Sequence, residues 1–209
     1  MFPPEEFPSP PLQIRLLNGG LQEKAPAAVP LQMQLQCVEQ WRALQREGGW
    51  PMLHSIFMDR EEVLASLLHQ RGSTAVVCVQ SWDEYCGVLS DYDYIPRKGC
   101  IRGALWLGAG SDHRHMEDFR HPCDGSLGNW PWLRHRWQDT LRDKQQVILY
   151  CGTGWRACEA LVAAQIMGIE GPDCRVFVYD GGWLEWSSHP DTNTPEWVEV
   201  KGKAPLPQE

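Results

Sequence analysis

The sequence predicts an α/β domain with a central parallel sheet and helices on both faces. Short apolar runs at 74–79, 147–150 and 175–179 are rich in β-branched or aromatic residues, as buried strands are. Segments with apolar residues at helical spacing lie between these runs. Strands that alternate with helices form parallel sheets whose connections cover the two faces, so we expect this arrangement here.

Two helix starts can be placed from capping residues. Asp59 is a good N-cap, and Glu62 three residues later completes a capping box. The apolar stripe of this helix, which runs for about three turns, consists of Val63, Leu64, Leu67 and Leu68. Ser81 and Glu84 form a second capping pair, which opens a short helix through Tyr85.

The other elements are expected from apolar spacing and from glycine or proline breaks. In chain order they are a polar loop at 87–100, a short strand at 103–107, a core-facing helix at 130–141, a helix at 156–167 that Gly168 closes, an Asp-Gly-Gly turn at 180–182, and a short helix that carries Trp183 and Trp186 and ends near Pro190.

Composition excludes several classes of protein. The chain has 209 residues, a hydrophobic fraction of 43% and 11 tryptophans, enough for a substantial core. The net charge of −8 and the absence of a basic cluster argue against nucleic acid as a partner. No apolar run reaches the length of a membrane span, and the first residues lack a basic region followed by an apolar segment, so we expect a cytoplasmic protein without a membrane partner. The eight cysteines contain no Cys-x-x-Cys pair, which favours free thiols.

The first 55 residues are expected to lie outside the main domain, which we place at 56–195, with a C-terminal tail at 196–209. Residues 1–11 are rich in proline, and 25–36 have the composition of a linker. Residues 12–23 align without gaps with the strand and turn at 174–185, so that Asn18 takes the place of Asp180. We therefore hypothesise a repeat: 12–24 would be the remnant strand and turn of an upstream copy of the domain, which a partner chain could supply.

A cysteine follows the strand at 147–150 and precedes a tight turn and a helix. Backbone N–H groups at a helix start have no internal partner and carry the positive end of the helix dipole. A loop that contains Gly152 and Gly154 can curl so that its amides converge on an anion. Such amides favour the thiolate of Cys151, and Arg156 adds a positive charge. The pattern therefore predicts a nucleophilic cysteine in an anion-binding loop, against the alternative of a small buried core residue.

The length of this loop separates two chemistries. Four residues lie between Cys151 and Arg156, whereas tyrosine phosphatases have five, which makes room for a phosphate ester. A shorter ring suits a single sulfur atom or a sulfonate better. The spacing therefore disfavours a phosphatase.

Two motifs resemble the rhodanese sulfurtransferases, and most closely the multi-domain thiosulfate sulfurtransferases. They are Tyr-Cys-Gly-Thr-Gly-Trp-Arg-Ala at 150–157 and Val-Tyr-Asp-Gly-Gly-Trp at 178–183, and the likeness extends in motif order over about 56–195. The resemblance implies a rhodanese-like fold, no cofactor, and transfer of a sulfane sulfur from thiosulfate through a Cys151 persulfide to a thiol, a carrier protein or cyanide. It also implies substrate-binding roles for Gly152, Thr153, Gly154, Trp155, Arg156, Asp180, Trp183 and Asp112.

Within that resemblance, Trp155 would close one side of the loop, and Asp112 would line the pocket together with Ser111 and His115. Most of each ring of Trp183 and Trp186 is expected in the core, and one of the two would also form a wall of the pocket. The alternatives are 3-mercaptopyruvate as the donor, or a catalytically silent module that binds or regulates a protein. The silent module is favoured by departures from the family pattern at Cys78, Gln80 and Arg102. The first two positions are usually an acid and a base, and here an uncharged pair could replace them.

Two further groups of side chains are weaker candidates. Histidines and a cysteine at His113, His115, His121 and Cys123 are metal-ligand types, but their spacing matches no standard zinc pattern, so no metal site is expected. Cys158 could resolve a persulfide, although a packed helix residue is the preferred interpretation.

Overall fold

The computed structural model describes residues 56–90, 92–108, 110–120, 127 and 131–205. The hypothesised repeat at 12–24 and the linker at 25–36 lie outside the described residues, as do His121 and Cys123. Among the helices that are described, none is long and apolar enough to cross a membrane.

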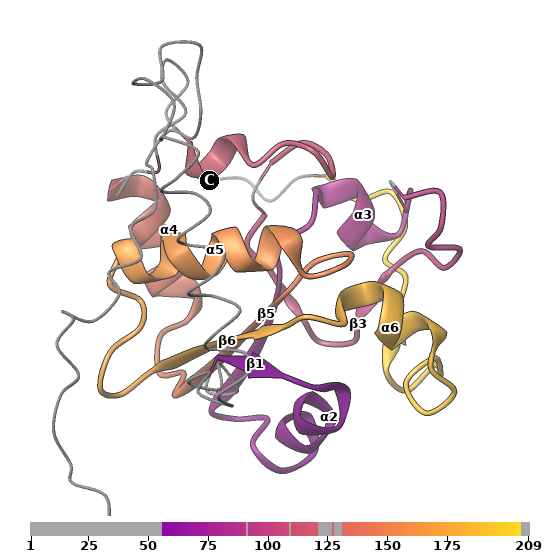
Figure 1. Cartoon of the computed structure of the whole chain (residues 1–209), viewed down its shortest axis with the longest axis horizontal. Helices are drawn as coiled ribbons and strands as arrows, with labels where there is room; N and C mark the ends of the chain where they lie inside the picture. Colours follow the sequence, from indigo (N-terminus) through magenta and orange to yellow (C-terminus); the bar gives the residue numbers. More distant parts are fainter. Residues whose placement is uncertain (1–55, 91, 109, 121–126, 128–130, 206–209) are drawn as a thin grey trace, which may run out of the picture.

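A five-stranded parallel sheet forms the centre of the domain, as predicted (Figure 1). Its strands are β1 (Phe57–Met58), β2 (Thr74–Cys78), β4 (Leu105–Trp106), β5 (Gln146–Tyr150) and β6 (Arg175–Tyr179), in the spatial order β1-β6-β5-β2-β4. β5 lies in the middle, with β2 and β6 hydrogen-bonded to it in parallel. Because parallel strands share one carboxyl edge, the segments that follow β2, β5 and β6 meet there.

Helices cover both faces of the sheet, which confirms the predicted class. On one face lie α4 (Pro131–Thr140) and α5 (Trp155–Ile166); on the other lie α2 (Arg60–His69), α3 (Trp82–Cys86) and α6 (Gly182–Ser188). A 3₁₀ turn, η2 (Glu117–Phe119), packs with the first group. The helices begin within a residue or two of the predicted positions, and both capping boxes form, at Asp59 with Glu62 and at Ser81 with Glu84.

The alternating side chains of β5 divide the core in two. Val147 and Leu149 face α4 and α5, where Trp137 is completely buried. Ile148 and Tyr150 face α2, α3 and α6 in the other cluster. Since a strand with both faces buried is apolar along its whole length, this explains the continuous apolar run in the sequence.

The domain continues beyond the predicted boundary at residue 195. A second small sheet pairs β3 (Cys100–Ile101) with β7 (Val198–Glu199) in antiparallel fashion. Trp197 is buried, and its carbonyl accepts a hydrogen bond from the indole of Trp186. Arg102 donates hydrogen bonds to the carbonyls of Pro195 and Val198. Aromatic burial and pairing with β3 hold residues 197–199 against the domain, within the segment that we expected to form a tail from 196.

Candidate active site

The Cys151 loop leaves the carboxyl end of the central strand. Cys151 follows β5 directly and is fully buried, and α5 begins four residues later. Gly154 is the N-cap of α5 with φ of 88°, and a Cβ built on it would lie 2.8 Å from the carbonyl oxygen of Asp180. A residue with a side chain would be strained and crowded at this position, so the sharp turn into the helix requires glycine.

Backbone amides of the loop are available to an anion. Within the described part of the chain, no hydrogen bond uses the N–H groups of Gly152, Thr153 or Gly154. The first N–H groups of α5 follow immediately and, at the start of a 12-residue helix, carry the positive end of its dipole. The loop therefore has the donors that an anionic sulfur or sulfonate needs.

The turn between β6 and α6 holds the Cys151 loop in place. The N–H of Trp183 donates to the carbonyl of Cys151 at 2.8 Å, and that of Leu184 donates to Gly152 at 3.0 Å. Gly182 has φ of 56°, and a Cβ on it would meet the Cys151 carbonyl oxygen at 2.6 Å. The two motifs that are far apart in the sequence are thus one structural unit.

We expect Gly182→Ala to displace the Cys151 loop, because both the backbone conformation and the close carbonyl exclude a Cβ. The substitution should destabilise the fold by about 2–4 kcal/mol. Gly103→Ala is the matched control, since Gly103 also has positive φ (78°) but nothing within 4 Å of its Cβ position. Thermal and chemical unfolding of both variants check this. Equal losses of stability would contradict a specific role for Gly182.

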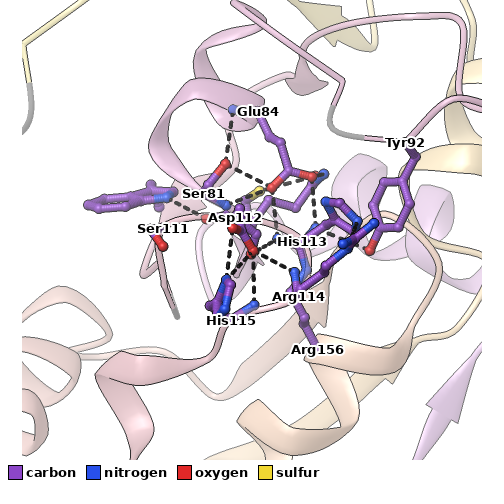
Figure 2. A network of polar contacts seen from close by, with 12 residues as sticks. Ser81, Glu84, Tyr92, Ser111, Asp112, His113, Arg114, His115 and Arg156 are labelled. Carbon is purple, nitrogen blue, oxygen red and sulfur yellow. Dashed lines mark hydrogen bonds and ion pairs between the residues drawn. The ribbon is translucent and has the colours of Figure 1, made fainter. Parts of the chain in front are cut away.

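Arg156 is engaged by a buried carboxylate from the other face of the sheet. Its Nη1 donates to Oε2 of Glu84 at 2.7 Å and its Nη2 donates to Oε1 at 2.8 Å (Figure 2). The exposed fractions of these side chains are 4% and 1%. Burial is the largest single influence on the pKa of Arg156 and lowers it, but the hydrogen bonds and charge of Glu84, with other nearby groups, outweigh burial and raise the pKa above its ordinary value. A bidentate pair of this kind fixes geometry as well as charge, so Arg156 joins α5 to α3 across the edge of the sheet.

The departure from the family pattern before α3 forms a neutral pair. The Cys78 thiol donates to Oε1 of Gln80 at 3.5 Å, and Nε2 of Gln80 donates to Glu84 at 2.9 Å. Burial raises the pKa of Cys78 well above its ordinary value, so this thiol stays protonated. Gln80, one of the two uncharged replacements, thus donates a hydrogen bond to the carboxylate that binds Arg156.

Tyr92 covers the Cys151 loop, and sequence reasoning missed it. A Cβ on Gly152 would lie 2.4 Å from Cε2 of Tyr92, so the ring rests on that glycine. The guanidinium of Arg156 lies 5.7 Å from the ring centroid, and its Nη2 is 3.5 Å from the Tyr92 hydroxyl. The ring of His113 packs against the same tyrosine at 4.9 Å. Burial raises the pKa of the Tyr92 phenol, which is therefore neutral at physiological pH.

The loop at 110–116 approaches the site through its backbone. The carbonyl of Asp112 accepts from Nη1 of Arg156 at 3.3 Å. The Asp112 carboxylate instead binds Nδ1 of His115 and the N–H groups of Arg114 and His115 (Figure 2). These hydrogen bonds lower the pKa of Asp112, and the one from the N–H of Arg114 has the largest effect. The N–H of Ser111 donates to Glu117.

The two tryptophans expected to contact substrate are placed differently. Trp155 is 82% exposed, so it does not close the loop against the thiol in this structure. Trp183 is 2% exposed and packs in the core on the sheet face that α2, α3 and α6 cover. Its indole N–H donates to the carbonyl of Arg97. Trp186 is completely buried as well. Trp183 binds the loop through its backbone N–H, which donates to the carbonyl of Cys151, and its ring lies in the core.

The remaining candidates lie at the rim of the site. Thr153 is half-buried, and Asp180 is exposed with its backbone against Gly154. Cys158 is exposed on the first turn of α5. Its pKa is raised by partial burial and then by the charges of Cys151 and Asp180. Among the described residues, no group of three or more His, Cys, Asp or Glu side chains could hold a metal ion.

The fold and the site define a class. A family model described as a rhodanese-like domain matches residues 61–189. The chain therefore belongs to the rhodanese family.

Within this family, the chain is similar to a thiosulfate sulfurtransferase in both sequence and structure. The chain is 39% identical over 182 residues to the thiosulfate sulfurtransferase YnjE of Escherichia coli K12, an alignment that covers 85% of this chain and 39% of the relative. The crystal structure of YnjE superposes with a TM-score of 0.58 and 41% identity, over 68% of this chain and 32% of that one. The chain thus spans well under half the length of this relative.

Two further structures are similar. One is the anaerobic ergothioneine biosynthesis enzyme from Chlorobium limicola in complex with its natural substrate trimethyl histidine, with a TM-score of 0.58 and 36% identity over 68% of this chain and 32% of that one. The other is a tyrosine variant of EanB with ergothioneine covalently linked to a persulfide cysteine, with a TM-score of 0.59 and 33% identity over 75% and 34%. A threonine variant of EanB was solved with hercynine.

Proposed function

We propose that this chain is a sulfurtransferase in which Cys151 carries a sulfane sulfur from thiosulfate to a thiol, a carrier protein or cyanide. The observation that carries the proposal is the placement of a buried cysteine in a loop of unpaired amides at the start of α5. The identity to a thiosulfate sulfurtransferase supports it.

The reaction has two balanced steps. The Cys151 thiolate attacks the outer sulfur of thiosulfate, the S–S bond to the sulfonate sulfur breaks, and sulfite leaves with the electron pair. An acceptor thiolate or cyanide then attacks the terminal sulfur of the persulfide, which returns the Cys151 thiolate. Covalent catalysis divides one difficult transfer into two easier ones, and the loop amides stabilise the anionic sulfur in both.

Steady-state kinetics with thiosulfate and cyanide test this proposal. We expect parallel double-reciprocal lines, which indicate a ping-pong mechanism. The same assay with 3-mercaptopyruvate in place of thiosulfate compares the donors. Transfer from mercaptopyruvate alone would overturn the choice of donor, and no transfer from either by folded protein would favour the silent binding module.

A second acceptor, a trimethylated histidine, is favoured by one specific observation. The tyrosine and the threonine that are substituted in EanB stand at the same separations from its persulfide cysteine as Tyr92 and Thr153 stand from Cys151. The Tyr92 ring, which rests on Gly152, lies where it would contact an acceptor that approaches Cys151. In this reaction the S–S bond of a protonated persulfide breaks and its terminal sulfur inserts into an imidazole C–H bond. The products are a thiolated imidazole and the regenerated Cys151 thiol.

Mass spectrometry of the small molecules tests this acceptor directly. After incubation of the protein with thiosulfate and trimethylhistidine, we expect a product that is one sulfur atom heavier than the histidine derivative. Cyanide provides the control acceptor, because it is small and does not need a contact with the Tyr92 ring to reach Cys151. Transfer to cyanide without any sulfur on trimethylhistidine would exclude this acceptor while leaving the sulfurtransferase intact.

A further inference from the structure

The charge of Arg156 is already cancelled before any ligand arrives. Arg156 is the second residue of α5, next to the loop amides, and both of its terminal nitrogens are bound by the two oxygens of Glu84. The two side chains are almost completely buried. A positive charge that would otherwise attract an anionic donor is therefore matched by a negative charge at hydrogen-bond distance.

Glu84 cannot turn away from this pair, because its own helix start holds it. Oε2 accepts from the backbone N–H of Ser81 at 2.9 Å and from the Ser81 hydroxyl at 2.8 Å. Oε1 accepts from Nε2 of Gln80 at 2.9 Å. The carboxylate thus receives donors from the segment that opens α3 and from α5, so several hydrogen bonds must break before it can leave Arg156.

The other described groups around the loop do not change this balance. From the 87–99 loop, Tyr92 is neutral because burial raises its pKa. From the 110–116 loop, Asp112 offers its carbonyl to Arg156, while its carboxylate is bound by His115 and backbone N–H groups. The ring of His113 lies against the Tyr92 ring.

The two remaining elements add only peripheral groups. From α5, Cys158 has a raised pKa, so its thiol stays protonated. From the β6–α6 turn, Asp180 is exposed and contacts Gly154 through its backbone. Solvent screens the exposed carboxylate of Asp180 much more than a buried pair, so among the described side chains the balance between Glu84 and Arg156 decides the charge next to the loop.

We infer that Glu84 is a positioning residue that determines specificity for the sulfur donor, by bracing Arg156 against the loop and cancelling its charge. Anions are then attracted by backbone amides alone, and an anionic leaving group such as sulfite is released readily. The part of the inference that concerns the donor rests on the proposed function. The part that concerns the charge next to the loop does not rest on it, because that charge can be measured without any sulfur donor.

The test compares the alkylation of Cys151 by iodoacetate and by iodoacetamide. Both reagents react with the thiolate, so the ratio of their rates is independent of the thiolate fraction and reports the local attraction for an anion. Peptide mass spectrometry follows Cys151, and the half-buried Cys174, at the amino end of β6, is the internal reference. The proteins are the native chain, Glu84→Gln, Arg156→Gln and the double variant.

We expect opposite effects from the two single substitutions. Glu84→Gln leaves Arg156 with a full charge and should raise the iodoacetate-to-iodoacetamide ratio about tenfold, whereas Arg156→Gln should lower it by a similar factor. The double variant should return to the native ratio, and Cys174 should not respond. Should one variant fail to fold, the sign expected for the other still decides. An unchanged ratio with both rates reduced alike would mean that the pair is only a structural brace, and would overturn the inference.

Because Cys151 is buried, anion affinity provides a second measurement. Cys151→Ser protein, with and without Glu84→Gln, is titrated with sodium sulfite. We expect binding about tenfold tighter when the carboxylate is neutralised, and equal affinities would contradict the inference. If the alkylation ratio and the affinity for sulfite each change about tenfold but the protein does not turn over thiosulfate, only the proposed donor is refuted.

Discussion

Replacing Cys151 with serine should abolish transfer of sulfur from thiosulfate to cyanide. A serine hydroxyl cannot form the persulfide that divides the reaction into two steps, so the rate should fall by more than about a thousandfold. The fold should be retained, because serine is nearly isosteric and the loop is held by the backbone bonds from Trp183 and Leu184. Steady-state thiocyanate formation, with circular dichroism as a check on folding, measures both.

Cys174→Ser is the control for this substitution. Cys174 lies in the turn before β6, at the opposite end of the strand from the site, so its loss should leave the rate within about twofold. Substantial turnover by folded Cys151→Ser protein would show that sulfur is carried elsewhere, and Cys158 would be the first residue to examine.

Replacing Glu84 with alanine should be the most destabilising single change at the site. It leaves the buried guanidinium of Arg156 without a counter-charge and removes the acceptor for Ser81 and Gln80. Removal of one partner from a buried pair costs about 3–5 kcal/mol, which corresponds to a fall in melting temperature of about 10 °C for a domain of this size. Chemical denaturation and thermal melting measure this loss.

An exposed ion pair provides the matched control for Glu84→Ala. Arg142 and Asp139 lie one turn apart, with side chains that are 71% and 69% exposed. Asp139→Ala should cost no more than about 0.5 kcal/mol, because solvent screens exposed pairs. A similar loss for the two variants would mean that the buried pair does not brace the loop.

Much of the fold could be predicted because local signals agreed with it. The apolar run that ends at Tyr150 has both faces buried, and the capping residues at Asp59 and Ser81 fix helix starts through short-range hydrogen bonds. The β3–β7 pair could not be predicted, because two-residue strands are too short to show a period. The burial of Trp197 depends on contact with Trp186, which only the folded chain creates.

The nucleophile and its loop were predictable, whereas their surroundings were not. Glycine spacing and the position of Cys151 at the end of a strand indicated the loop. Glu84 was interpreted only as a cap, yet the same carboxylate also binds Arg156. Tyr92 comes from a loop without periodicity, and its place above Gly152 depends on how that loop returns over the sheet edge. The ring of Trp183 lies in the core, as we expected for most of it, but its hydrogen bond to the carbonyl of Arg97 could not be predicted because that residue comes from a distant loop.

The most direct measurement is the intact mass of the protein after incubation with thiosulfate and removal of the donor. If Cys151 carries the sulfur, the native chain should gain one sulfur atom, cyanide should remove it, and Cys151→Ser should gain none. A folded native chain that gains no sulfur, or a Cys151→Ser chain that gains as much as the native one, would contradict the account.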